Sequence, residues 1–174
     1  SYAYSHSGPI GPVLDPLRRG LLSENPRFRN AVLAAIGSCN PVTLRTNVEK
    51  ILLFDPSAWV REGAASTLLR LDQPDESLPA FRQAFASGFK NENVVYALAR
   101  YGNDDDIRAV LPVLKSKDEN LRRSVAQGLS QARLDKPRPA CDALLESLHD
   151  PSNKVRIAAM RALGHFRDSR AIAP

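Results

Sequence analysis

Apolar and small residues recur along this chain at spacings of three and four. After Asp150 they stand at five positions: Val155, Ala158, Ala159, Ala162 and Leu163. Side chains three and four positions apart share one face of an α-helix, whereas a half-buried strand alternates with period two. No segment sustains that alternation. The pattern therefore predicts an all-α protein.

The same helical pattern returns about every 30 residues. Segments starting at Ser23, Asp55, Ser116 and Asp150 align, each with an apolar anchor five places in and an arginine directly after it. The anchors are Phe28, Val60, Leu121 and Val155, and the arginines are Arg29, Arg61, Arg122 and Arg156. A degenerate copy starts near residue 88, with Asn93 at the anchor and no arginine. A period of this length is typical of solenoids, whose repeats pack on their neighbours.

A second amphipathic segment follows each copy, so two helices per repeat are predicted. These segments cover residues 42–54, 75–86, 105–115 and 140–149. In the third, Ile107, Val110, Leu111 and Leu114 form the apolar stripe. We expect a tail over 1–12 and a solenoid over 13–174: a half repeat, then repeats starting near 23, 55, 88, 116 and 150. The last repeat ends within its second helix, where FRDSRAIAP matches DDDIRAVLP, so a fragment of a longer solenoid is expected.

The register D-P-x-x-x-V-R-x-x-A-A-x-x-A-L-G, with second helices that read A-I-P or V-L-P, resembles the HEAT-like repeats of the bacterial phycobilisome lyase type. The resemblance covers residues 13–174. It implies an α-solenoid, or α-α superhelix, of about five helical hairpins, with the second helices on the concave side. It also implies a structural ladder between neighbouring repeats, formed by Asp55, Arg61, Asp150 and Arg156. An arginine fork beside a carboxylate satisfies charge at a partly buried junction, which favours a structural role over phosphate binding.

Proteins with such repeats include scaffolds, adaptors, bilin lyase subunits and DNA glycosylases, so the fold alone does not fix the function. We expect a non-catalytic scaffold or adaptor that binds a protein along the concave face of the second helices. Outward positions there carry mixed charges, which suit an acidic or mixed peptide better than a uniform polyanion. The partner-binding candidates are Arg45, Glu49, Lys50, Arg82, Arg108 and Lys115.

Candidate chemistry is sparse. His6, His149 and His165 fit no zinc spacing, and no phosphate-binding loop or nucleophile motif occurs, so neither a metal nor a cofactor is expected. Two alternatives stay open. One is a bilin lyase-like or chaperone subunit. The other is a DNA-binding protein of the alkylation-repair glycosylase type, which would use Trp59 and the basic segment with Arg133, Lys136 and Arg138.

The amino-acid composition restricts the class of protein and its partners only modestly. The chain has 174 residues, of which 43% are hydrophobic and 25% charged, as in ordinary soluble proteins. Its net charge of +5 is mild and spread out, so nucleic acid is an unlikely partner. No apolar stretch is long enough to span a membrane. Cys39 and Cys141 form no CxxC motif, so the reducing cytoplasm is expected, with a cleaved export signal left open. We also expect a monomer.

Overall fold

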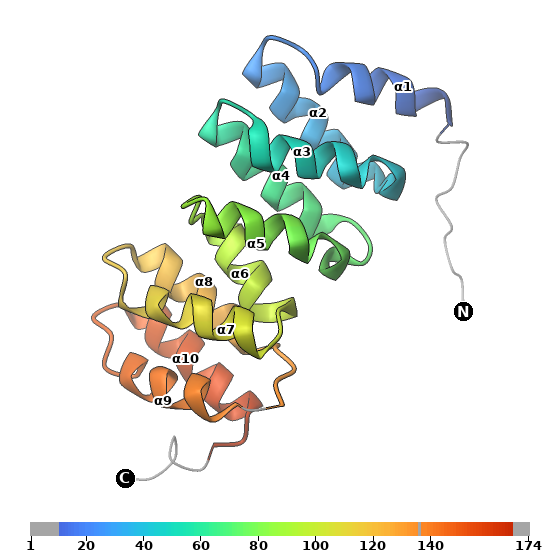
Figure 1. Ribbon diagram of the computed structural model, residues 1–174. Coiled ribbons are helices and arrows are strands. Elements are labelled where there is room, and N and C mark those ends of the chain that lie inside the picture. Colours follow the sequence, from blue (N-terminus) through green and yellow to red (C-terminus); the bar gives the residue numbers. More distant parts are fainter. Residues whose placement is uncertain (1–10, 136, 169–174) are drawn as a thin grey trace. The chain divides into compact units, whose positions relative to one another are not determined.

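The computed structural model describes residues 11–135 and 137–168, and over these residues the protein is helical with no strands (Figure 1). The all-α prediction is confirmed, and the paired helices are those of an α-solenoid. The chain divides into two compact units, Ser1–Asp72 and Gln73–Pro174. The expected tail and the matching FRDSRAIAP segment lie mostly outside the described residues.

Unit 1 (Ser1–Asp72) is a stack of antiparallel helices. Two first helices of the repeats, α2 and α4, pack against each other, and α3 packs on α4. The buried side chains include Leu33 and Ile36 of α2, Leu52 of α3 and Leu68 of α4. In chain order the elements are α1 (Gly11–Gly20), α2 (Pro26–Cys39), the short 3-10 helix η1 (Val42–Leu44), α3 (Arg45–Phe54) and α4 (Ala58–Arg70).

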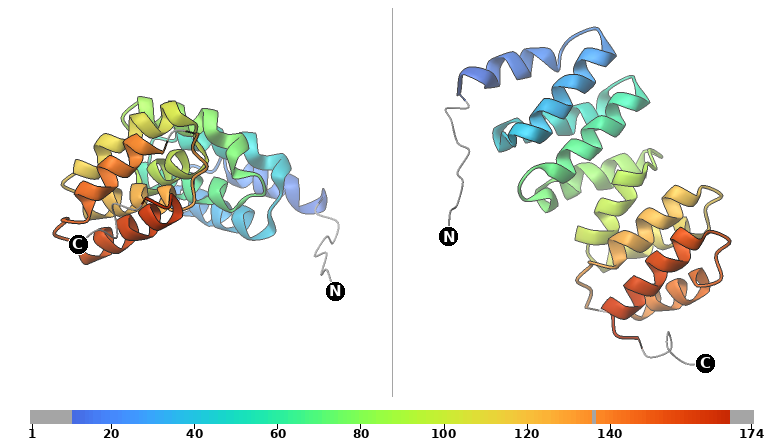
Figure 2. Two further views of the ribbon diagram at one scale, coloured as in Figure 1. Left: turned by 90° about the horizontal axis from the view of Figure 1, so that it is seen from below. Right: turned by 180° about the vertical axis from the view of Figure 1, so that it is seen from behind.

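Unit 2 (Gln73–Pro174) repeats this arrangement. The first helices α6, α8 and α10 pack in series, and α5, α7 and α9 are the second helices (Figure 2). Pro112 lacks an N–H group, so α7 does not continue as an α-helix and tightens into the 3-10 helix η3. The elements are η2 (Pro74–Ser77), α5 (Leu78–Ala86), α6 (Glu92–Tyr101), α7 (Asp104–Val110), η3 (Leu111–Lys115), α8 (Glu119–Leu129), α9 (Arg138–Ser147) and α10 (Asn153–His165).

Small residues set the distance between first helices. A Cβ added to Gly128 of α8 would lie 2.6 Å from the Cβ of Ala99 and 2.8 Å from the carbonyl oxygen of Tyr96, both on α6. Such distances are well inside van der Waals contact. Glycine at this position therefore allows α6 and α8 to approach closely.

The apolar anchors are not equivalent. Val60 and Val155 are fully buried, as the repeat pattern predicts, but Phe28 is 54% exposed. Within the described part of the chain no first helix precedes α2. At the other end, Met160 of α10 is also 54% exposed, although its counterpart Ala126 on α8 is fully buried. The two end helices thus each leave one apolar face uncovered in the described structure.

Candidate partner-binding surface

A buried ion pair in unit 1 joins α2 to the loop that precedes α4. The guanidinium of Arg29 on α2 donates from Nε to Oδ2 of Asp55 at 2.7 Å and from Nη2 to Oδ1 at 2.8 Å. Its Nη1 donates to the carbonyl oxygens of Ser23 and Glu24 at 2.8 and 3.1 Å. One arginine therefore connects the loop before its own helix with the start of the next repeat.

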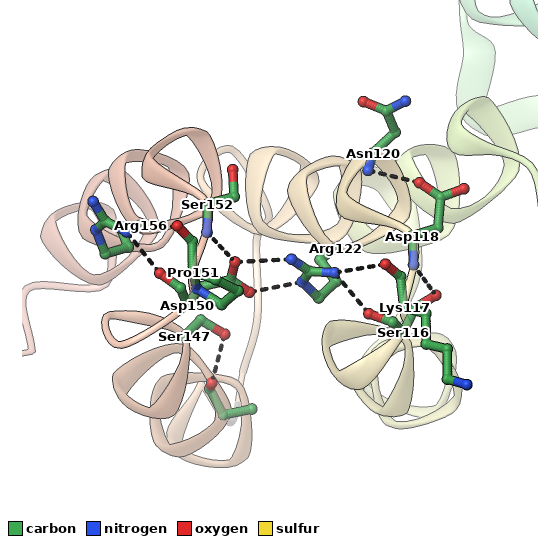
Figure 3. A network of polar contacts seen from close by, with 11 residues as sticks. Ser116, Lys117, Asp118, Asn120, Arg122, Ser147, Asp150, Pro151, Ser152 and Arg156 are labelled. Carbon is green, nitrogen blue, oxygen red and sulfur yellow. Dashed lines mark hydrogen bonds and ion pairs between the residues drawn. The ribbon is translucent and has the colours of Figure 1, made fainter.

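Unit 2 contains the same arrangement at the α8–α10 junction (Figure 3). Arg122 donates from Nε and Nη2 to the carboxylate of Asp150 at 2.7 and 2.9 Å, and from Nη1 to the carbonyl oxygen of Ser116 at 2.8 Å. A bidentate fork of this kind fixes direction as well as distance. Repeating it at two junctions makes it a structural element of the stack.

The structure gives the expected ladder a definite direction. The carboxylates of Asp55 and Asp150 accept from arginines of the preceding repeat, Arg29 and Arg122. Arg156 instead donates to the carbonyl oxygen of its own Asp150 at 2.7 Å (Figure 3). Arg61 occupies the same position on α4 and also has an interaction partner.

A third bidentate pair links second helices. Arg82 of α5 donates to both carboxylate oxygens of Asp106 on α7, each at 2.7 Å. Asp106 also closes a capping box, because it accepts from the backbone N–H of Asn103 while the Asn103 side chain accepts from the N–H of Asp106. The three acids at 104–106 in the sequence indicate the helix start, but no motif points to Arg82.

The ion pairs shift the acid titration of this protein. Hydrogen bonds from Arg122 lower the pKa of Asp150 below its ordinary value of 3.8, against the opposing effect of burial. Burial alone would raise the pKa of Asp106, but the bonds from Arg82 and Asn103 outweigh it, so this pKa is lowered too. Both carboxylates are thus ionised more readily in the folded chain than in the unfolded one.

Stability is therefore expected to fall in acid. A carboxyl group with a lowered pKa stabilises the fold fully above its unfolded pKa, about 3.9, and this contribution is lost as the pH falls through the folded pKa. Urea unfolding midpoints should be nearly constant between about pH 5.5 and 7 and drop below about pH 4. Asp150→Asn should flatten part of that drop. A midpoint that is the same at pH 3 and pH 6 would contradict this account.

The predicted partner-binding residues lie in both units: Arg45, Glu49 and Lys50 in unit 1, and Arg82, Arg108 and Lys115 in unit 2. Arg45 is buried and donates to the carbonyl oxygen of Asp72, so its expected outward position is wrong. It stands at the start of α3, where the side chain reaches the end of unit 1 and not the solvent. Lys50 is exposed on α3, and Glu49 beside it is partly buried and has an interaction partner.

The remaining three candidates are basic residues that already have acidic partners. Arg82 pairs with Asp106, and Arg108 pairs with Asp105 three positions before it. Lys115 of η3 pairs with Glu146 of α9 at 3.1 Å. Each remains at least partly exposed, but its charge is largely neutralised locally. Lys50, in contrast, is an exposed cation that takes part in none of these ion pairs.

The features expected of a DNA glycosylase lie in different units of the described chain. Trp59 is half-exposed on the first turn of α4, in unit 1. Arg133 borders two pockets in unit 2, one with Asp104, Asp105 and Asp135 and the other with Asp75 and Arg100. Lys136 and His6 lie outside the described residues. Across residues 11–135 and 137–168 no group of His, Cys, Asp and Glu side chains could hold a metal, and no helix is long and apolar enough to cross a membrane.

An apolar groove in unit 1 was not predicted from the sequence. It lies beside the C-terminal end of α3, against the loop between α1 and α2, and exposes two large side chains, Leu22 at 79% and Phe54 at 71%. The Arg29–Asp55 pair forms part of its wall. The lining residues are Leu22, Ser23, Arg29, Lys50, Ile51, Phe54, Asp55 and Pro56. An exposed apolar side chain at a helix end is inconspicuous in a sequence, because the amphipathic pattern does not distinguish the last turn.

Comparison with known proteins agrees with the fold. Residues 107–174 match the family of HEAT repeats, a stretch that begins within α7 and includes α8, α9 and α10. This match supports a HEAT-like repeat protein. No curated protein matches the chain.

Proposed function

We propose that this chain is a non-catalytic scaffold or adaptor that binds a partner protein along its second helices. The observation that carries the proposal is the exposure of large side chains at a second-helix end, above all Phe54 and Leu22. Contiguous exposed apolar side chains commonly mark interaction sites on soluble proteins. The HEAT-repeat match over residues 107–174 adds to this, since such repeats generally mediate protein–protein interaction.

The charge network favours binding over catalysis. The carboxylates with lowered pKa, Asp106 and Asp150, are engaged by arginines and by backbone N–H groups in pairs that hold helices together. A general acid or base instead needs a pKa near neutrality and access to a substrate. These two groups have neither property, so they serve the framework.

Photo-crosslinking tests which helices meet the partner. A photoreactive phenylalanine analogue replaces Arg108, which is exposed on the second helix α7, or Gln127, which is exposed on the first helix α8. Both sites lie in unit 2. In cells that make the protein, we expect adducts with a discrete partner from position 108 and not from position 127. Adducts from position 127 alone, or from neither position, would overturn the proposal.

The alanine-rich repeat register supports the finer assignment to HEAT repeats of the bacterial phycobilisome lyase type. Free cysteines, one exposed at Cys39 and one buried at Cys141, support a reducing compartment such as the cytoplasm. We propose that the chain acts there as a monomer without a cofactor. The mixed charges of the second helices support a mixed or acidic protein partner rather than nucleic acid.

A further inference from the structure

Two grooves occupy the same place in two different repeats. Each one is lined by the aspartate of a buried arginine–aspartate pair, Asp55 of Arg29–Asp55 in unit 1 and Asp150 of Arg122–Asp150 in unit 2. Aligning the repeats on these pairs puts residues of the first groove opposite residues of the second. The second groove is lined by Leu111, Leu114, Lys115, Ala143, Glu146, Ser147, His149 and Asp150.

The two grooves differ in the residues that face each other across them. In unit 2, Lys115 on one wall and Glu146 on the other form an ion pair at 3.1 Å. The register puts Leu22 in place of Lys115 and Ile51 in place of Glu146. The same framework therefore carries a bridging ion pair in one copy and two apolar walls in the other.

The two grooves also differ at another pair of equivalent positions. His149 lines the second groove, whereas Phe54 stands at the equivalent place in the first and is 71% exposed. Burying a Leu or Phe side chain contributes favourable free energy. Most of this stabilisation is not realised for Leu22 and Phe54, because both side chains lie largely in solvent. A partner that covers them gains it on binding.

The charged residues that line the first groove indicate the second chemical feature of a ligand. Arg29 and Asp55 neutralise each other, and Lys50 is the one other charged residue that lines the first groove. The groove thus has apolar walls with a single net positive charge at the rim. Its complement is a large apolar side chain followed or preceded by a carboxylate.

We propose that the groove formed by Leu22, Lys50, Ile51 and Phe54 binds a short peptide segment of a partner protein, inserting one large apolar side chain and placing an acidic residue against Lys50. The inference rests on the proposed scaffold function and specifies the partner's chemistry. A second copy of this chain is the competing occupant.

Peptide display on the whole chain tests the site. Random dodecapeptides on phage are selected against the 174-residue protein, and the enriched peptides are synthesised and titrated by fluorescence anisotropy. We expect enrichment of a large apolar residue next to Asp or Glu. Leu22→Lys combined with Ile51→Glu, which copies the ion pair of the second groove, should weaken binding by roughly tenfold or more. Lys50→Glu should shift the selection from acidic to basic flanking residues.

The repeat symmetry supplies a matched control. Lys115→Leu combined with Glu146→Ile leaves the second groove with His149 and Leu145 where the first has Phe54 and Lys50, so it should not change binding of the selected peptides. Circular dichroism should show all variants equally folded. The groove assignment would be overturned if the selected peptides bound the Leu22→Lys, Ile51→Glu variant with unchanged affinity. It would also be overturned if the phage selection enriched no peptide. Concentration-dependent dimers lost in that variant would overturn it in favour of self-association. If the photo-crosslinked partner persists in that variant, only the groove assignment fails and the scaffold function stands.

Discussion

Arg29→Met is expected to lower the free energy of unfolding by about 3 to 5 kcal/mol. The side chain of Asp55 is only 2% exposed, so the variant leaves a buried carboxylate without its cation. The loss also frees the carbonyl oxygens of Ser23 and Glu24, which accept from the same guanidinium. Urea unfolding followed by circular dichroism at pH 7 measures the difference.

Two further variants separate burial from charge. Arg108→Met removes an exposed pair with Asp105 and should cost less than about 1 kcal/mol. Adding Asp55→Leu to Arg29→Met should restore much of the stability, because no unpaired charge remains buried. A loss below about 1 kcal/mol for Arg29→Met alone would show that the pair is not essential to the fold.

Leu163→Ala is expected to cost about 2 to 4 kcal/mol, and Ile36→Ala a similar amount. Both side chains are fully buried, one on α10 and the other on α2, so truncation leaves a cavity inside a packed stack. Thermal and urea unfolding of the two variants test this. Phe28→Ala is the informative comparison, because the exposed ring has less packing to lose and its removal should cost less than about 1 kcal/mol. Equal losses at Phe28 and Leu163 would contradict the structural distinction.

Phe28 shows that the repeat pattern alone does not predict which apolar side chains are buried. The sequence pattern predicts the helices and most buried positions, because an apolar stripe with helical spacing requires a packed neighbour. Val155 and Phe28 have the same register, yet only Val155 is buried. The pattern specifies which face of a helix is apolar, but whether that face is covered depends on the preceding helix.

The ladder illustrates a similar limit for polar residues. Repeated Asp and Arg residues predict ion pairs at the repeat junctions, but not which repeat supplies each partner. The bond from Arg29 to Asp55 spans 26 positions and is set by how α2 and α4 stack. The burial of Arg45 could not be predicted from the repeat pattern. Its hydrogen bond to the carbonyl oxygen of Asp72 depends on the path of the loop after α4. The groove beside Phe54 depends on loop positions in the same way.

The close contact between α6 and α8 has a consequence for how unit 2 opens. At this junction Val94 stands where other repeats have the ladder arginine, and Ser116 stands where they have the aspartate. The close contact through Gly128 brings these two helices together, and the ion pair between Glu92 of α6 and Arg123 of α8, at 3.4 Å, is partly exposed. The neighbouring α8–α10 junction depends on Asp150, which loses its charge in strong acid. Hydrogen exchange at low pH should therefore release the amides of α9 and α10 first, while α6 and α8 stay protected as a smaller cooperative block.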